Sequence, residues 1–318
     1  MSAAGQNPQS KQHWAAQNER GNALFLRLTT LMVRYLPAWL MQPCIFFVVA
    51  YFYLTSPQAR QNVRRYQTQV QAAYFGVFLP KFSVFKQFIA FGVSICDRFA
   101  VWQGKIHYRD LRVSDPNRIS ERVDAAAKRA GQRGEMFVCS HFGNMEICRA
   151  LVSHHQGFKL NVLVHSHHAK QFNQALENAG AARISLIQVS DLDAALMLEL
   201  NRRLEAGEWL AIAADRVPIR GDKTVSVSFL DKMAEFPQGA WLLAILLKTP
   251  VHSLFCVKED GQYHLKIQSY TGELGGKRSE RVSQVQTAAQ WFADVLGEEC
   301  RLQPLQWFNF YDFWNEKS

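Results

Sequence analysis

A histidine and a glutamate lie five residues apart in the segment VCSHFGNMEICRAL, residues 138–151. The segment begins as an apolar strand and ends as a helix, with His141 and Glu146 on either side of Gly143. Residues five apart on one continuous helix point about 140° away from each other, so a single helix does not bring these side chains together. A turn at Gly143, with Glu146 in the first helical turn, does. The spacing therefore predicts a strand, a turn and a helix that place an imidazole beside a carboxylate.

An imidazole paired with a carboxylate is suited to act as a general base. In this interpretation Glu146 accepts a hydrogen bond from one ring nitrogen of His141, and the other nitrogen takes a proton from a hydroxyl or an amine. No nucleophilic serine or cysteine is needed if that acceptor attacks an activated acyl group directly. The spacing alone also fits a histidine with a purely structural role. Features elsewhere in the chain are needed to distinguish a catalytic from a structural His141.

Four further residues are candidates for binding a substrate. Asp215 and Arg216 follow the apolar strand WLAIAA, and a parallel sheet brings them to the same edge as His141. Arg216 suits a phosphate or an oxyanion, with a surface ion pair as the alternative. Asn144 either donates to an oxyanion or caps the helix that follows it. Lys170 is a candidate for attracting an acidic partner protein, or belongs to a solvated helix face.

We expect neither a metal site nor a disulfide. His165, His167 and His168 cluster, but their spacing without an adjacent carboxylate is not that of a zinc site, and a polar loop is the preferred interpretation. The six cysteines form no Cys-x-x-Cys pair, which indicates a reducing compartment and argues against thiol catalysis.

The composition is that of a globular protein with an anionic partner. Of its 318 residues 48% are hydrophobic and 20% are charged, and the net charge is +9 with a pI of about 9.3. This balance indicates a membrane surface, an acidic carrier protein or a nucleic acid, with a merely basic soluble protein as the alternative. No nucleic-acid-binding motif accompanies the charge, so we expect no nucleic-acid partner.

The amino-terminal part of the chain is unusually apolar. We expect residues 1–13 to form a disordered tail and residues 14–99 a hydrophobic, membrane-associated helical region. Residues 35–54 contain no charge, and a run of 20 such residues is about the length that crosses a bilayer. Pro37 and Pro43 interrupt this run, so a re-entrant or interfacial element fits at least as well as a span. A buried core helix is the alternative.

From about residue 100 onward, strand patterns alternate with helix patterns. Such alternation predicts that residues 100–318 form an α/β domain with a mixed, mostly parallel sheet flanked by helices. The last two strands form a hairpin around Asp260 and Gly261. Strands are predicted at GEMFVCSH, FKLNVLVHS, ISLIQVS, EWLAIAAD, VSVSFL, PVHSLFCVKE and QYHLKIQSY, and helices at residues 118–133, 168–180, 191–207, 239–249 and 281–302.

The segment HFGNMEICRAL resembles the His-Phe-Gly-Asn-Trp-Glu block of the lauroyl/myristoyl acyltransferases of lipid A biosynthesis, within the lysophospholipid acyltransferase superfamily. Met145 stands in place of the usual tryptophan. The resemblance continues in order through LVHSHHAKQFNQAL, LEAGEWLAIAADRVP, VSVSFLDKMAEFPQGAWLLAILLKTPV and PLQWFNFYDFW, and it covers roughly residues 20–314.

This resemblance implies a glycerol-3-phosphate acyltransferase-like fold and makes residues 100–318 a catalytic acyltransferase domain. It implies His141 as general base and Glu146 as its carboxylate partner. The expected reaction moves an acyl group from acyl carrier protein or acyl-CoA, without a cofactor, to a lipid-like acceptor at the cytoplasmic face of the inner membrane. A catalytically silent, membrane-bound module that binds lipid or acyl carrier protein is the alternative.

Three positions depart from the lipid A enzymes. Leu305 stands where they carry the Glu of Pro-Glu-Gln-Trp, Arg216 stands where they carry Gln or His, and Phe229-Leu230-Asp231 stands where they carry Phe-Phe-Gly. In these features the chain looks more like a predicted acyltransferase branch associated with aryl polyene pigment gene clusters. Lipid A is therefore not assumed as the acceptor.

Overall fold

The computed structural model describes Tyr35 and residues 38–314, with gaps at 103, 129–130, 149–151, 153, 156, 165–183, 190–192 and 218–222. Three predictions lie outside the described residues. They are the disordered tail at 1–13, the helix at 168–180 that carries Lys170, and the polar loop around His165.

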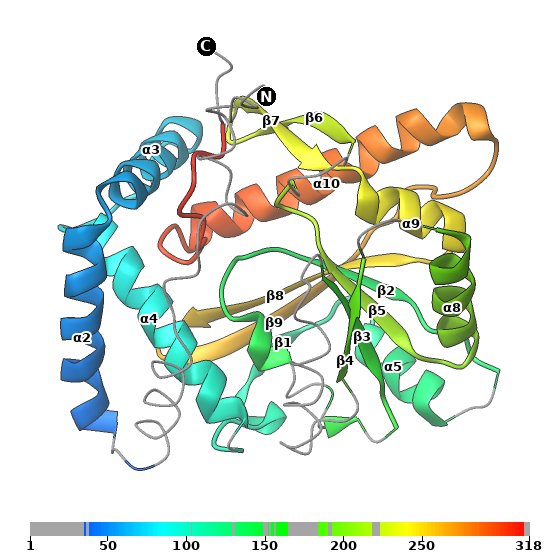
Figure 1. Ribbon diagram of the computed structural model, residues 1–318, viewed down its shortest axis with the longest axis horizontal. Helices are drawn as coiled ribbons and strands as arrows, with labels where there is room; N and C mark the ends of the chain where they lie inside the picture. Colours follow the sequence, from blue (N-terminus) through cyan, green and yellow to red (C-terminus); the bar gives the residue numbers. More distant parts are fainter. Residues whose placement is uncertain are drawn as a thin grey trace, which may run out of the picture.

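A seven-stranded sheet forms the centre of the molecule, in the order β1-β9-β8-β2-β5-β3-β4 (Figure 1). Five neighbouring strands are parallel, β9 is antiparallel to β8, and β1 is parallel to β9. The predicted α/β class with a mixed, mostly parallel sheet is thus confirmed. The strands are β1 (Arg112–Ser114), β2 (Met136–Cys139), β3 (Leu160–Val164), β4 (Ile184–Gln188), β5 (Trp209–Ala213), β8 (Val251–Glu259) and β9 (Gln262–Ser269).

Helices cover both faces of this sheet, which explains why β2 is apolar along its whole length. Met136 and Val138 belong to the core cluster that includes Trp241, whereas Phe137 belongs to the cluster that includes Val123. Successive side chains of β2 therefore enter opposite cores. Figure 1 shows α9 and α10 on one side and α5 on the other. These helices are α5 (Ile119–Lys128), α8 (Ala194–Glu205), α9 (Gly239–Leu247) and α10 (Arg281–Leu302).

Two hairpins of the structure differ in how strongly their turn residues predict them from sequence. The predicted β8–β9 hairpin is confirmed, and its turn residues Asp260 and Gly261 have φ of 49° and 84°. A second hairpin pairs β6 (Thr224–Phe229) with β7 (Lys232–Pro237). Its turn uses Leu230 and Asp231 at φ of 52° and 60°. Because Leu-Asp is not an Asn-Gly type of turn signal, β7 was not predicted.

Three helices precede the sheet: α2 (Ala38–Thr55), α3 (Pro57–Ala73) and α4 (Ser83–Trp102). Pro43 lies inside α2, so the expectation that it interrupts the apolar run is wrong. The chain bends instead at Pro57, the first residue of α3, because the residue before a proline disfavours helical geometry. None of the described helices is by itself long and apolar enough to cross a membrane, whereas Leu40–Thr55 and Pro57–Ala73, bent by 95°, pass that test as a pair.

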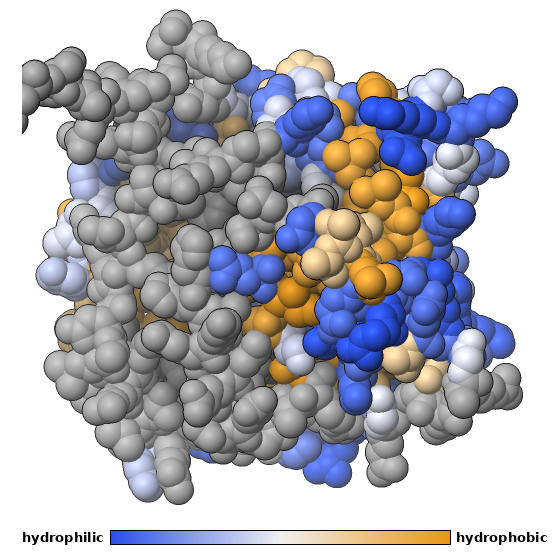
Figure 2. Space-filling view, turned by 45° about the vertical axis from the view of Figure 1, so that its right-hand side comes forward, coloured by the Kyte–Doolittle hydropathy of each residue, from blue (hydrophilic) through white to orange (hydrophobic). Residues whose placement is uncertain are grey.

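Exposed apolar side chains occur on more than one face of the molecule. Figure 2 shows a band of hydrophobic side chains between hydrophilic ones on the side that carries α8 and α9. Leu198 of α8 and Leu246 of α9 are among the exposed residues. The largest exposed fractions, however, belong to the connection between α3 and α4, where Phe75, Phe78 and Phe82 are 107%, 84% and 81% exposed.

Candidate active site

The turn predicted at Gly143 is present, directly beyond the carboxyl end of β2. Gly143 has φ of 66°, and a Cβ built there would lie 2.0 Å from the carbonyl oxygen of Cys256. The Asn144 amide donates to that same carbonyl at 2.7 Å. A glycine is therefore required, because the chain turns in a left-handed conformation against a neighbouring strand. Met145–Cys148 follow as a short 3₁₀ helix.

The carboxylate that contacts the His141 ring is Asp215. His141 Nδ1 lies 2.9 Å from Asp215 Oδ1, and the His141 backbone amide donates to Asp215 Oδ2 at 2.9 Å. Asp215 follows β5, which pairs with β2 in parallel register so that Ala213 lies opposite Cys139. The prediction that Asp215 shares a sheet edge with His141 is confirmed, and the two side chains are in direct contact.

Asp215 fixes the tautomer and the orientation of the imidazole. Burial works against the charged form of Asp215, but the charge and hydrogen bonds of His141, together with Arg216, outweigh it and hold the pKa of this carboxyl below its ordinary value. An ionised carboxylate only accepts, so Nδ1 carries a proton whether the ring is charged or neutral, and in the neutral ring the lone pair lies on Nε2. No described residue hydrogen-bonds Nε2, and 38% of the side chain is exposed. In the neutral ring, Nε2 is therefore the nitrogen that can accept a proton.

Glu146 lies in a different environment from the one predicted. Glu146 was expected to bond one ring nitrogen of His141, but the carboxylate that bonds the ring, at Nδ1, is that of Asp215. Glu146 sits in the 3₁₀ helix after the turn, and its Oε1 lies 3.9 Å from Nε of Arg98 in α4. Local spacing favoured Glu146, whereas the pairing of β2 with β5 brings a carboxylate to Nδ1 from far along the chain. A catalytic role for Glu146 stays a prediction.

The other predicted site residues have distinct positions. The side-chain oxygen of Asn144 caps the 3₁₀ helix by accepting from the Glu146 backbone amide at 3.2 Å. The side-chain nitrogen of Asn144 donates to the Ser94 carbonyl at 2.9 Å. Of the two roles left open for Asn144, the structure therefore shows capping. Arg216 donates to the Phe308 carbonyl at 2.9 Å. Contact of Asn144, Arg216 or Lys170 with a substrate stays a prediction.

Two cysteine thiols close to the site, Cys139 and Cys148, are buried and hard to ionise. Burial raises the pKa of the Cys139 thiol, and a contact with Cys256 together with burial raises that of Cys148. Both groups are therefore protonated near neutral pH, which does not favour either as a thiolate nucleophile. Within the described part of the chain, no three metal-binding side chains gather.

One residue at the site was not predicted to belong to it. Trp307 donates its indole N–H to Asp215 Oδ2 at 3.3 Å and is fully buried. Because 92 residues separate it from Asp215, no local spacing indicated the contact. The Leu305-Gln306-Trp307 stretch was visible in the resemblance, but only as a motif without a role.

The fold and the site together define an α/β protein in which a partly exposed histidine is held by a buried aspartate at the carboxyl ends of neighbouring parallel strands. Residues 85–316 match the family model for the bacterial lipid A biosynthesis acyltransferase, and the chain belongs to that family. It is an acyltransferase of the lysophospholipid acyltransferase type. No curated protein matches the sequence closely enough to count as a relative. The matched range includes His141, Asp215 and Trp307 but leaves out α2 and α3.

Proposed function

We propose that this acyltransferase moves a fatty acyl group, or a related polyene acyl group, from acyl carrier protein or coenzyme A to a hydroxyl of a lipid-like acceptor. Its family in general uses acyl-carrier-protein donors and lipid acceptors and is associated with the inner membrane. The observation that carries the proposal is His141, whose Nδ1 is held by Asp215 and whose Nε2 is accessible.

The proposed course uses only the histidine–aspartate pair as base and acid. Nε2 of His141 takes the proton of the acceptor hydroxyl while its oxygen forms a bond to the thioester carbonyl carbon. The carbon–sulfur bond then breaks, and the leaving thiolate takes the proton back from the imidazolium. Asp215 stabilises the imidazolium between these two steps, as the carboxylate of a hydrolase triad does. Arg216, next to Asp215, is our candidate for a phosphate-bearing group of donor or acceptor.

We propose an acceptor other than lipid A, as in the branch associated with aryl polyene clusters. Supporting this, departures from the lipid A enzymes lie close to the histidine–aspartate pair. Arg216 follows Asp215 directly, and Leu305 precedes the stretch in which the Gln306 carbonyl accepts from Gly143. A silent module that binds lipid or carrier protein is the second candidate, but a binding module has no use for a base with a fixed tautomer.

The test of the proposed function is a comparison of lipids with and without the gene. We expect mass spectrometry to show that one acylated lipid disappears when the gene is deleted and returns with the wild-type gene but not with His141→Ala. Purified protein should also consume an acyl-carrier-protein thioester only when the extract containing that acceptor is added. An unchanged lipid profile together with no acceptor-dependent consumption would leave the silent binding module as the better explanation.

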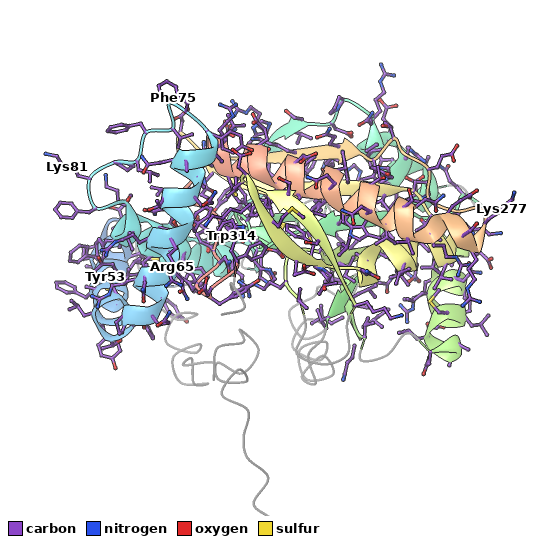
Figure 3. All side chains as sticks on the ribbon, turned by 90° about the horizontal axis from the view of Figure 1, so that it is seen from above. Tyr53, Arg65, Phe75, Lys81, Lys277 and Trp314 are labelled. Carbon is purple, nitrogen blue, oxygen red and sulfur yellow. The ribbon has the colours of Figure 1, made fainter. Side chains whose placement is uncertain are left out.

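We propose that the face formed by α2 and the α3–α4 connection contacts the inner membrane from the cytoplasmic side. Figure 3 shows Phe75 and Lys81 projecting outward from that connection, away from the sheet. Phe75, Phe78 and Phe82 are almost wholly exposed, and Phe47 and Tyr51 of α2 are 70% and 63% exposed. Aromatic rings beside a lysine are suited to the interface of an anionic bilayer.

Replacing Phe75, Phe78 and Phe82 together by Ser should weaken binding to phosphatidylglycerol-containing vesicles at least about tenfold, because burying one Phe side chain contributes about 2 kcal/mol. Co-sedimentation of the purified protein with vesicles measures the change. Val282→Ser is the matched control, since Val282 is 81% exposed on α10 and lies outside the proposed face. Equal binding by the triple variant and the control would contradict this face as the contact surface.

A further inference from the structure

We propose that Trp307 is a positioning residue for the acyl-transfer reaction, because its indole N–H fixes the Asp215 carboxylate and thereby the His141 ring. The chemistry rests on the proposed function, but the positioning is a property of the protein alone. Trp307 touches neither the acceptor nor the thioester in this proposal and acts only through Asp215.

The contacts of Asp215 explain how one indole orients the imidazole. Oδ2 accepts from two donors, the His141 backbone amide at 2.9 Å and Trp307 Nε1 at 3.3 Å. With Oδ2 held in this way, Oδ1 is presented to Nδ1 of the ring at 2.9 Å. Asp215 and Trp307 are 1% and 0% exposed, and a hydrogen bond to a charged group is stronger in such a water-excluded environment. The indole therefore restrains rotation of the carboxylate.

The indole is itself held rigidly by aromatic neighbours. Its ring centroid lies 4.9 Å from that of Tyr66, 5.3 Å from that of Phe229 and 4.8 Å from that of Phe313. The Trp307 carbonyl accepts from the side chain of Gln87 in α4 at 2.7 Å. Because the ring is packed on several sides, its N–H direction is set before any substrate arrives.

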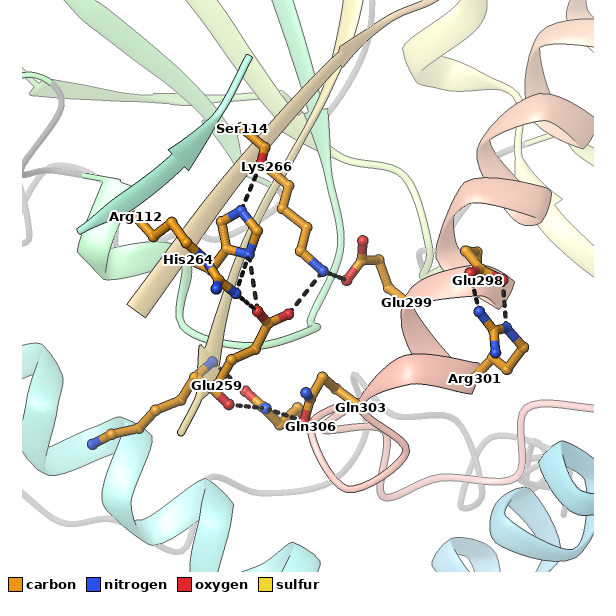
Figure 4. A network of polar contacts seen from close by, with 11 residues as sticks. Arg112, Ser114, Glu259, His264, Lys266, Glu298, Glu299, Arg301, Gln303 and Gln306 are labelled. Atoms are coloured by element: carbon orange, nitrogen blue, oxygen red, sulfur yellow. Dashed lines mark hydrogen bonds and ion pairs between the residues drawn. The ribbon is translucent and has the colours of Figure 1, made fainter. Parts of the chain in front are cut away.

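The same stretch of chain also holds the backbone around His141. The Gln306 carbonyl accepts from the Gly143 amide at 2.8 Å, and the Phe308 amide donates to the His141 carbonyl at 2.9 Å. The side chain of Gln306 in turn accepts from the Lys258 amide at 2.8 Å and donates to the Lys258 carbonyl at 2.7 Å. It also donates to the side chain of Gln303 at 3.2 Å (Figure 4). Residues 306–308 therefore bond the backbone of His141, the carboxylate of Asp215 and the turn at Gly143.

The deciding experiment removes the donor and keeps the ring. Trp307 is replaced by 3-benzothienylalanine, in which sulfur stands in place of the indole N–H, and in parallel by Phe. Trp241→Phe is the matched control, because Trp241 is also 0% exposed and its Nε1 has no hydrogen-bond partner within the described structure. Arg216, Tyr311, Cys139 and Cys300, the other ionisable groups that interact with Asp215, stay unchanged.

We expect the benzothienylalanine variant to lower kcat about tenfold with little change in KM, the size of effect that loss of a hydrogen bond to a charged group gives. Without the indole donor more negative charge stays available to the imidazolium, so His141 holds its proton to higher pH. The acid limb of the kcat/KM profile should therefore move to higher pH, and so should the midpoint of the His141 imidazole titration followed by NMR. Trp241→Phe should show neither change.

The outcomes separate this inference from the proposed function. Identical kcat, pH profile and NMR titration in the Trp307 variant and the wild type would overturn the positioning role. A loss of kcat equal to that of Trp241→Phe, without a shift of the NMR titration, would also overturn it, because packing alone would explain the loss. If the wild-type protein consumes no thioester, the proposed function fails, and the NMR titration still decides whether Trp307 controls His141.

Discussion

His141→Gln should fold and lose acyl transfer by a factor of about a hundred to ten thousand, the usual contribution of a general base. Glutamine is chosen because its amide can still donate to Asp215, whose carboxylate is 1% exposed and would otherwise lose a hydrogen-bond donor. What glutamine lacks is a nitrogen that takes up a proton near neutral pH. The rate of acceptor-dependent thioester consumption measures the loss, and a thermal melt measures the fold.

His107→Gln is the control for this substitution. The His107 side chain is 53% exposed and lies beside Asp110, outside the site. Its variant should keep the wild-type rate. Turnover in His141→Gln close to that of His107→Gln would end the mechanism proposed here, whatever the thermal melts show.

The strand, the turn and the sheet edge were predictable because their signals are local. Four consecutive apolar residues, 136–139, indicated a buried strand, and Gly143 indicated the turn. The β8–β9 hairpin carried a strong Asp-Gly signal. In contrast, the β6–β7 hairpin was missed because Leu230 and Asp231 reach left-handed geometry without a glycine. Tertiary packing, rather than the preference of the turn residues, sustains that turn.

The partner of His141 was not predictable from spacing. Glu146 is five residues away in sequence, whereas Asp215 is 74 residues away, and spacing alone ranks the nearer carboxylate first. The topological rule that parallel strands end at one edge did place Asp215 near His141. This rule does not give the orientation of the Asp215 carboxylate. That orientation depends on the Trp307 indole and on the His141 amide, which contact Asp215 only in the folded chain. Long-range side-chain contacts of this kind leave no periodic trace in a sequence.

The two carboxylates can be ranked by experiment, with Asp215→Asn against Glu146→Gln. An asparagine at 215 presents an N–H to His141 Nδ1 and so favours the tautomer that carries its proton on Nε2, which is then no base. In the serine protease triad the corresponding change costs about ten thousandfold in kcat, and we expect a loss of that order for Asp215→Asn. Glu146→Gln should cost less, because Asp215 still holds the ring. The reverse ranking in steady-state rates would restore the carboxylate predicted from sequence.

A pH series of thermal melts gives Asp215→Asn a second signature, independent of turnover. Although burial alone would raise it, the pKa of the Asp215 carboxyl lies below its ordinary value in the folded state, owing to His141 and Arg216. A carboxyl of this kind adds stability above its unfolded pKa of about 4, and that stability is lost as the pH falls through the folded value. Wild-type protein should therefore melt higher than Asp215→Asn at pH 7, and the gap should narrow in acid. A gap that stays constant from pH 7 down to about pH 3 would mean that the Asp215 charge does not hold His141 in place.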